Sequence, residues 1–177
     1  MKTNRKLFLM MGVPGSGKSS WAIREIQYAN VLFDKVIYIS RDNIRYNLLQ
    51  DEDKYFDKEK EVFKIFCDKI NQAIANPQAD AIIADATHLN SKSRYKLLNQ
   101  LENKKYLDEI NVIFMATPID IAIERNNQRT GRAKVPAQTI RQMHRTIELP
   151  TEKEGIDRLY IVNTEGKVII KNLHYKK

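Results

Sequence analysis

Residues 12–19, Gly-Val-Pro-Gly-Ser-Gly-Lys-Ser, have the residue types and the spacing of a phosphate-binding loop. The apolar run 7–11 precedes the loop directly and a helical pattern begins near Lys18, so the context is a strand, a tight loop and a helix. Glycines adopt backbone conformations that are closed to other residues, which turns successive N–H groups and the helix N-terminus toward phosphate oxygens. The stretch therefore predicts a site for a nucleoside triphosphate, in preference to a simple glycine-rich turn.

Two side chains at the end of this loop are expected to act on the triphosphate. Lys18 can reach the β- and γ-phosphates, and the Ser19 hydroxyl is the expected Mg²⁺ ligand. The implied cofactors are ATP and Mg²⁺. The residues expected to contact the nucleotide are Gly12, Pro14, Gly15, Ser16, Gly17, Lys18, Ser19 and Ser20.

Two aspartates follow apolar, strand-like runs further along the chain. Asp42 could accept the proton of a hydroxyl that attacks in line with the γ-phosphate, or it could cap a helix over residues 43–50. Asp85 could help to hold Mg²⁺, could orient the acceptor or a catalytic arginine, or could form a helix-capping turn with Thr87. His88 has no second His or Cys at metal-ligand spacing, so we expect a loop residue and not a metal ligand.

Basic residues gather in the segment 125–148, which is predicted to form two helices and the loop between them. As a mobile lid, this segment would bring a cation to the γ-phosphate, where it can raise the rate on the order of 10³–10⁵. Arg129 and Arg132 compete for this role, and a solvated basic face is the alternative. Arg45 lies one helical turn beyond Asp42 and could hold a phosphate of the acceptor. The lid cations are Arg125, Arg129, Arg132, Lys134, Arg141 and Arg145.

Short apolar runs alternate with helical patterns, which favours a parallel sheet covered by helices on both faces. We predict an α/β fold of the P-loop kinase type, with about five parallel strands, a helical lid and a C-terminal hairpin. Ligands bind outside the carboxyl ends of such strands, so the loop, Asp42, Asp85 and Thr117 should lie along one edge. Strands are expected at 7–11, 35–39, 81–84, 111–115 and 158–162 with a hairpin to 168–170, and helices at 18–29, 43–50, 57–75, 91–104, 118–129 and 136–148.

The composition is that of one domain, because 177 residues, of which 42% are hydrophobic, can bury one substantial core. The single Cys67 excludes an internal disulfide and suits a reducing compartment, and we expect a small apolar residue in a helix. No apolar run is long enough to cross a bilayer or to form a signal-peptide core, so we expect a cytoplasmic protein. The net charge of +8 favours a polyanionic partner.

Several of these segments together resemble the P-loop polynucleotide 5′-hydroxyl kinases, as represented by the kinase domain of bacteriophage T4 polynucleotide kinase. The matching segments follow the same order at similar spacing over about residues 7–148, and are 12–22, Arg41-Asp42 with Arg45, 83–90, Arg125-Asn126 with Arg129, and Val135-Pro136. The resemblance implies transfer of the γ-phosphate of ATP to the 5′-hydroxyl end of RNA or DNA.

Matching positions also imply roles for single residues. Asp42 would be the general base, Arg129 the transition-state cation and Arg45 the contact to the first 3′-side phosphate of the acceptor. The lid is one residue longer than the family pattern, which leaves Arg132 as a rival to Arg129 or as a nucleotide contact. The family's phosphatase motif has no counterpart, so we expect residues 1–177 to form a single kinase domain. The acceptor-binding residues would be Arg41, Arg45, Asp85 and Thr87.

Other functions share part of this pattern. A P-loop kinase that acts on a small-molecule hydroxyl has the same loop and a similar aspartate at a strand end. A GTPase switch is less well supported, because Asn103-Lys104-Lys105 is followed by Tyr106 and not by the aspartate that reads guanine. A non-catalytic nucleic-acid binder would predict an altered Lys18 or Ser19, and both are intact.

Overall fold

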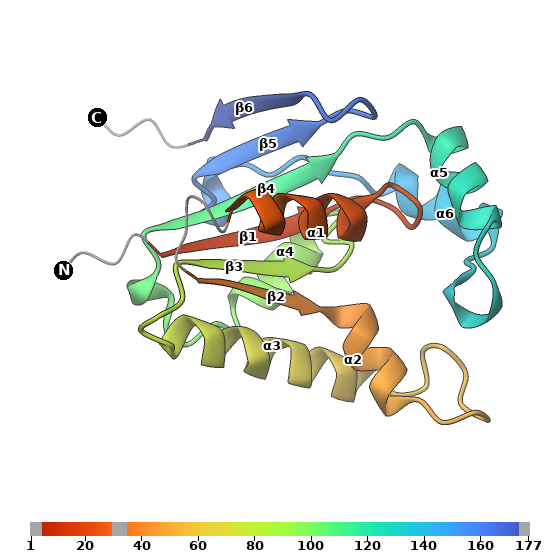
Figure 1. The fold of residues 1–177 in the computed structure, drawn as a ribbon, viewed down its shortest axis with the longest axis horizontal. Helices are drawn as coiled ribbons and strands as arrows, with labels where there is room; N and C mark the ends of the chain where they lie inside the picture. Colours follow the sequence, from red (N-terminus) through yellow and green to blue (C-terminus); the bar gives the residue numbers. More distant parts are fainter. Residues whose placement is uncertain (1–4, 30–34, 174–177) are drawn as a thin grey trace.

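A computed structural model describes residues 5–29 and 35–173, and the side chains of these residues apart from 26–29. At its centre is a six-stranded sheet in the order β2-β3-β1-β4-β5-β6 (Figure 1). Strands β1 to β5 are parallel, and β6 pairs antiparallel with β5 as the C-terminal hairpin, which confirms the predicted α/β fold class. The strands are β1 (Lys6–Met11), β2 (Val36–Ser40), β3 (Ala81–Asp85), β4 (Glu109–Met115), β5 (Arg158–Val162) and β6 (Val168–Asn172).

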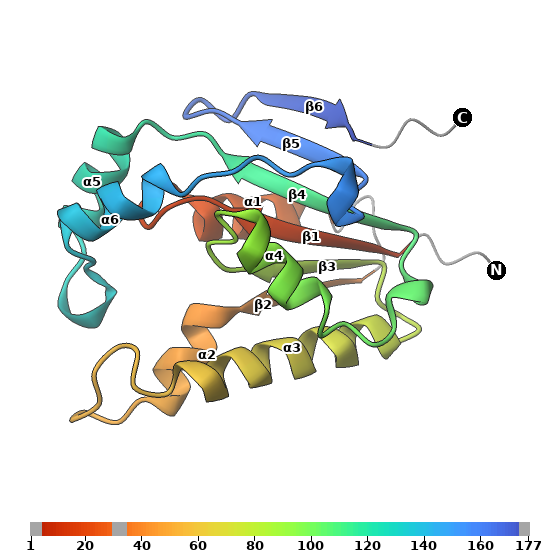
Figure 2. The same ribbon diagram turned by 180° about the vertical axis from the view of Figure 1, so that it is seen from behind.

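Helices cover both faces of the sheet. Helix α1 lies on one face and α3 and α4 on the other, while α5 and α6 lie together at the end of the molecule to which the strand arrows of β1 to β5 point (Figures 1 and 2). The helices are α1 (Lys18–Ala29), α2 (Arg41–Leu48), α3 (Glu59–Ala75), α4 (Ser91–Leu98), α5 (Ile119–Asn127) and α6 (Ala137–Arg145), and the short 3₁₀ turns are η1 (Lys104–Tyr106), η2 (Gly131–Ala133) and η3 (Glu152–Glu154).

The central strands are apolar throughout because both of their faces are buried. Leu9 of β1 packs with Phe66 in the layer under α3 and α4, whereas the next residue, Met10, packs with Ala22 of α1 on the opposite face. A third cluster, Val13, Leu89, Ala122, Ile123 and Ile140, joins the loop after β1 to the base of α5 and α6. The core therefore fixes the phosphate-binding loop from two sides. Cys67 is buried in α3, as predicted.

The carboxyl ends of the parallel strands meet at one edge of the sheet, as predicted. The loop 12–17 leaves β1, α2 begins directly after β2, and Asp85 is the last residue of β3. Thr117 follows β4, and its Oγ1 donates a hydrogen bond of 2.8 Å to the Ser16 carbonyl, so this side chain supports the loop. None of the helices in the described ranges combines the length and the apolar composition needed to cross a membrane.

The start of α2 corrects one alternative from the sequence. The helix begins at Arg41, and the Ser40 side chain accepts a 3.2 Å hydrogen bond from the Asn43 N–H, so Ser40 is the N-cap. Asp42 lies in the first turn of the helix and does not cap it. Its carboxylate is therefore not engaged in capping the helix.

The prediction of a helix over 91–104 was wrong at the C-terminal end, because α4 ends at Leu98. The Asn71 side chain of α3 donates to the Gln100 carbonyl at 2.9 Å and accepts from the Glu102 N–H at 3.1 Å. These bonds fix the chain in an irregular turn, and no local sequence pattern predicts them. The other helices begin and end within about three residues of the predicted bounds.

Candidate active site

The loop between β1 and α1 has the conformation that its glycines allow. Gly15 (φ +81°) and Gly17 (φ +92°) adopt left-handed conformations that other residues rarely take. A Cβ on Gly15 would lie 2.0 Å from the Ala122 carbonyl oxygen, so the loop packs against α5 at a distance that only glycine permits. The Gly12 N–H donates to the Thr87 carbonyl at 3.0 Å, which ties the loop to the segment after β3.

Lys18 is held inside this loop. Its Nζ donates to the carbonyl oxygens of Gly12 at 2.9 Å and Val13 at 3.0 Å. Burial lowers the pKa of Lys18, and the nearby charges of Asp85 and Asp42 oppose that shift. The Ser16 Oγ, also in the loop, is buried without a hydrogen-bond partner among the described residues. A buried cation and an unpartnered hydroxyl within one glycine-rich cradle fit the phosphates of a nucleotide.

Ser19 and Asp85 form a hydroxyl–carboxylate pair at the start of α1. The Ser19 Oγ donates to Asp85 Oδ2 at 2.6 Å, and the Tyr38 hydroxyl donates to the same oxygen at 2.5 Å. Burial, followed by the hydrogen bond to Asp85, raises the pKa of Tyr38. Mg²⁺ in nucleotide sites is bound through one or two protein oxygens together with phosphates and waters, and this pair fits that requirement. Asn90, and not Asp85, caps the helix that follows.

Asp42 lies within a network from α2, α3 and the segment joining them. Its Oδ1 accepts hydrogen bonds from Arg45 Nη1 and from the Tyr55 hydroxyl, the latter at 2.8 Å. Arg45 is buried, and its Nη2 donates to Glu59 Oε2 at 2.6 Å. Arg41 pairs with the other oxygen of Glu59. The Nε atoms of both arginines are buried without a partner among the described residues, which leaves donors for an anionic ligand.

The two lid arginines that were candidates for the transition-state cation lie in different places. Arg129, just after α5, lines the cavity beside the loop. Arg132, in η2, donates through Nη2 to the carbonyl oxygens of Gln50, at 2.6 Å, and Asp51. This contact joins the lid to the segment between α2 and α3. The structure thus brings Arg129, and not Arg132, into the cavity, and the role of each remains a prediction.

These groups surround one cavity of about 360 Å³. The phosphate-binding loop, Asp42 with its network, and the lid each contribute part of the wall. Of the residues predicted to contact nucleotide or acceptor, the lining includes Pro14, Gly15, Gly17, Lys18, Ser19, Ser20, Arg41, Asp42, Arg45, Asp85, Thr87 and Arg129.

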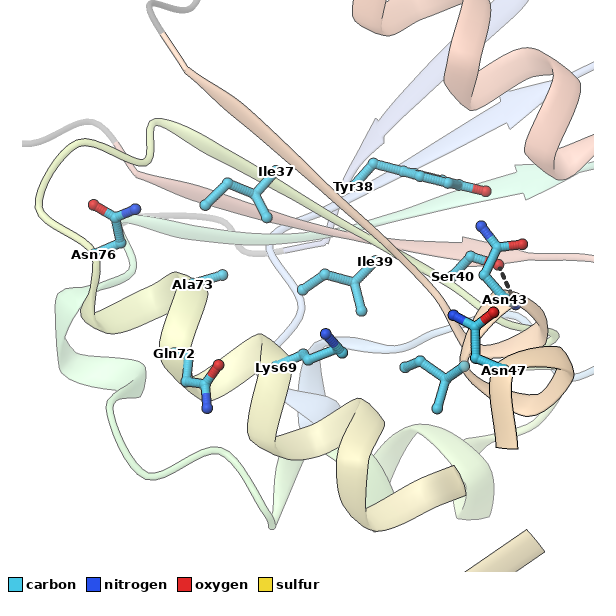
Figure 3. A pocket seen from close by; sticks show the side chains of 11 residues that line it. Ile37, Tyr38, Ile39, Ser40, Asn43, Asn47, Lys69, Gln72, Ala73 and Asn76 are labelled. Atoms are coloured by element: carbon cyan, nitrogen blue, oxygen red, sulfur yellow. Dashed lines mark hydrogen bonds between the residues drawn. The ribbon is translucent and has the colours of Figure 1, made fainter. Parts of the chain in front are cut away.

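A second cavity of about 410 Å³ lies along the outer edge of β2, between α2 and α3 (Figure 3). Its lining is mostly apolar or carboxamide, with Ile37, Ile39, Asn43, Asn47 and Gln72 among the residues drawn. Tyr38 is also among the lining residues, and its hydroxyl donates to Asp85. None of the residues predicted to act on nucleotide or acceptor lines this second cavity. The loop-lined cavity is therefore the candidate active site.

Several residues that line this cavity or bond to its lining were not predicted. Tyr38 bonds to Asp85, Tyr55 and Glu59 bond to the Asp42–Arg45 pair, and Phe56 lines the cavity next to Tyr55. A single sequence carries little signal for them, because each acts through a contact made by folding. The adjacent aromatic residues Tyr55 and Phe56, which follow the acidic run 51–53, are the local feature that could have drawn attention to this segment.

His88 is a buried loop residue, as predicted, with φ +41°. Its Nδ1 lies 2.8 Å from the carbonyl oxygen of Met10, and because a carbonyl can only accept, Nδ1 carries the proton. Burial lowers the pKa of His88 to about 4. The ring therefore braces the end of β1 beneath the loop in its neutral form.

The arrangement of strand, loop, buried lysine and lid matches a family model for the AAA domain (AAA_33), which aligns with residues 7–150. The chain belongs to this family. The match includes the phosphate-binding loop, both aspartates and both lid helices, so the domain is of the P-loop kinase type.

Individual relatives confirm the resemblance to polynucleotide kinases. A protein of Autographa californica nuclear polyhedrosis virus, provisionally named a bifunctional polynucleotide kinase/RNA ligase, is 22% identical over 152 residues, or 82% of this chain. The chain spans only 21% of that relative's length. A chain in the structure of the Pnkp1/Rnl/Hen1 RNA repair complex is similar to 100% of this chain over 51% of its own length, with 22% identity and a TM-score of 0.68.

The same fold is found with a different acceptor. A sugar kinase from Janibacter sp. HTCC2649 has a TM-score of 0.59 and 16% identity, covering 93% of this chain and 87% of its own. The fold alone therefore does not select the acceptor, and the acceptor side of the cavity has to be considered by itself.

Proposed function

We propose that this protein is an ATP- and Mg²⁺-dependent kinase that transfers the γ-phosphate to the 5′-hydroxyl end of RNA or DNA. The observation that carries the proposal is that the phosphate-binding loop and Asp42 line one and the same cavity. A phosphate donor bound at the loop and a hydroxyl acceptor bound at Asp42 would therefore meet within that cavity. Transfer is then direct and in line, and no residue becomes phosphorylated.

Asp42 is the proposed general base. Within the described residues both donors to this carboxylate bond to Oδ1, which leaves Oδ2 to accept the proton of the 5′-hydroxyl. As the oxygen of the 5′-hydroxyl bonds to the γ-phosphorus, the bond from phosphorus to the bridging β,γ-oxygen breaks and ADP leaves. Arg45 and Tyr55 keep the carboxylate in one orientation throughout.

The charge of the transferring phosphoryl group is neutralised from the loop and the lid. Lys18 and the loop N–H groups bind the phosphates, and Arg129 supplies a further cation from the lid. Ser19 and Asp85 would hold Mg²⁺, which neutralises phosphate charge when it is bound. Arg132 closes the lid against the segment after α2.

A polynucleotide acceptor is favoured by the chemistry of the acceptor side and by the relatives. The buried Arg45 and the neighbouring Arg41 provide donors for a backbone phosphate next to the reacting hydroxyl. The net charge of +8 suits a polyanion. The names of the viral relative and of the repair complex point the same way.

The test is transfer from terminally labelled ATP, with Mg²⁺, to short RNA and DNA oligonucleotides that carry a 5′-hydroxyl. Label should appear at the 5′ end, and Asp42→Asn should lower kcat by about 10²–10⁴-fold while ATP still binds. Asp120→Asn is the matched control, because Asp120 is an exposed aspartate in the first turn of α5.

Two outcomes would contradict the proposal. If no oligonucleotide is labelled although ATP binds, the acceptor is a small-molecule hydroxyl, as in the sugar kinase that shares this fold. If Asp42→Asn loses ATP binding and turnover equally, Asp42 is structural or metal-binding and is not the base.

A further inference from the structure

We propose that Phe56, supported by Tyr55, is a stacking site for the nucleobase of the acceptor's 5′-terminal nucleotide. The inference rests on the proposed function and adds a subsite to it. It concerns the segment between α2 and α3, which projects at the same end of the molecule as α5 and α6 (Figures 1 and 2).

Phe56 is exposed in an unusual place. The residue is 67% exposed, yet it lines the cavity that contains the phosphate-binding loop. Single exposed aromatic residues are common on protein surfaces and need no explanation. An exposed phenyl ring in the wall of a cavity that also holds the phosphate-binding loop and Asp42 is different, because its apolar face is available to a flat ligand in the site.

The ring is also held in position. Tyr55 packs against Phe56 edge to face, with ring centroids 4.8 Å apart and an interplanar angle of 90°. The segment itself is fixed by two side-chain bonds, from the Gln50 N–H to Asp53 and from the Lys54 N–H to Asp57, both of 2.8 Å. A preorganised aromatic surface loses little conformational freedom when a ligand stacks on it.

The aromatic pair lies next to the proposed base and the proposed phosphate contact. The Tyr55 hydroxyl is 2.8 Å from Asp42 Oδ1, so the ring pair starts at the carboxylate that would accept the acceptor's proton. The guanidinium of Arg45 lies 4.4 Å from the Tyr55 ring centroid and 5.8 Å from that of Phe56. The proposed base, the proposed phosphate contact and the aromatic pair thus lie close together. They match the 5′-hydroxyl, the phosphate and the base of a terminal nucleotide.

Stacking on an aromatic ring accepts every base, because each base has a π-face. The subsite therefore predicts affinity for a terminal base without preference for its sequence. A small sugar acceptor has no flat aromatic group to cover Phe56. The aromatic pair thus favours nucleotides over sugars on the acceptor side.

The experiment compares two 5′-hydroxyl oligonucleotides that differ only in the terminal nucleotide, which is either intact or abasic. Phe56→Ala should lower kcat/KM on the intact acceptor roughly five- to a hundredfold and should leave kcat/KM on the abasic acceptor unchanged. Phe56→Trp, which keeps an aromatic ring at this position, should keep the preference for the intact acceptor over the abasic one. Tyr106→Ala, an exposed aromatic residue in η1 outside the cavity, is the matched control.

Each contrary result has a distinct meaning. Equal loss on both acceptors, no loss on either, or a rise in the KM for ATP alone would overturn the stacking site while the kinase activity stands. Failure of the wild-type protein to label either oligonucleotide would overturn the proposed function, and the stacking site with it.

Discussion

The two sides of the cavity are built in different ways. The nucleotide side is made mainly of backbone: a loop with left-handed glycines, tied by Gly12 to the Thr87 carbonyl and by Ser16 to Thr117. The acceptor side is made of side chains, because Asp42, Arg45 and their partners come from two helices and the segment joining them.

This difference separates a general function from a specific one. A backbone cradle recognises phosphate, which every nucleotide carries, and it tolerates few changes because its conformation depends on glycine. A side-chain network can be altered residue by residue without disturbing the sheet. The nucleotide side would thus be the common part of the fold and the acceptor side the part that selects the substrate.

The largest expected effect comes from the lid, which joins the two sides. Arg129 lines the cavity whereas Arg132 bonds the carbonyl oxygens of Gln50 and Asp51. Arg129→Ala should therefore lower kcat by about 10³-fold or more, since it removes the transition-state cation. Arg132→Ala should lower kcat less than about tenfold, as loss of a surface contact does. Single-turnover kinetics separates the two, and the reverse order would make Arg132 the cation.

A smaller effect is expected from the backbone of the loop. Gly15→Ala places a methyl group 2.0 Å from the Ala122 carbonyl, whereas the nearest atom to a methyl on Gly17 is Arg125 Nη1 at 3.6 Å. Both substitutions suffer the cost of a positive φ, but only the first forces the backbone to move. We expect ATP affinity to fall about a hundredfold in Gly15→Ala and about tenfold in Gly17→Ala, measured by calorimetry. Equal losses of ATP affinity in the two variants would mean that the loop can move away from α5 to accommodate the methyl group.

The same contrast explains how far the sequence predicts the structure. The loop and its flanking elements were predicted, because the pattern is local: Lys18 and Ser19 follow the glycines directly, and a strand and a helix flank them. The contacts of these residues with nucleotide stay a prediction. The shared edge of the sheet was predicted as well, since parallel strands leave little choice of where a strand-end residue such as Asp85 can lie.

The acceptor side was predicted only in part. Asp42 and Arg45 could be placed from their positions after β2, but Glu59 and Tyr55 reach them through tertiary contacts at separations that no period links. The end of α4 escaped prediction for the same reason, because Asn71 of another helix fixes it. Long-range side-chain bonds are where a single sequence carries the least information.

The next smaller effect is expected on the acceptor side. Arg45→Ala should raise the KM for the oligonucleotide about tenfold or more, because a charge-assisted bond to the acceptor phosphate is lost, and should leave the KM for ATP unchanged. Since the substitution also removes one of the two arginines that pair with Glu59, the double variant with Glu59→Gln shows whether the loss comes from the acceptor or from the altered charge balance at Glu59. A rise in the KM for ATP alone would move Arg45 to the nucleotide side.

The smallest effect at neutral pH is expected at His88, which braces the end of β1 under the loop. Burial, and then the charges of Arg41, Arg94 and Lys18, lower the pKa of His88 to about 4, while the bond to Met10 opposes the shift. The unfolded chain then binds a proton more readily than the folded one, so stability is intact above about pH 6.5 and falls as the pH drops toward 4.

We expect the wild-type free energy of unfolding to fall by about 2 kcal/mol between pH 7.5 and pH 5 through this group alone. His88→Asn should remove that part of the dependence, and asparagine also tolerates the left-handed backbone at this position. His144→Asn, in the exposed part of α6, is the control. Urea titrations at both pH values measure the difference, and equal slopes in all three proteins would mean that His88 takes up its proton without cost. Nucleotide affinity, measured at the same pH values, shows whether acid weakens binding at the loop before it affects the acceptor side. This order is expected if His88 supports the loop.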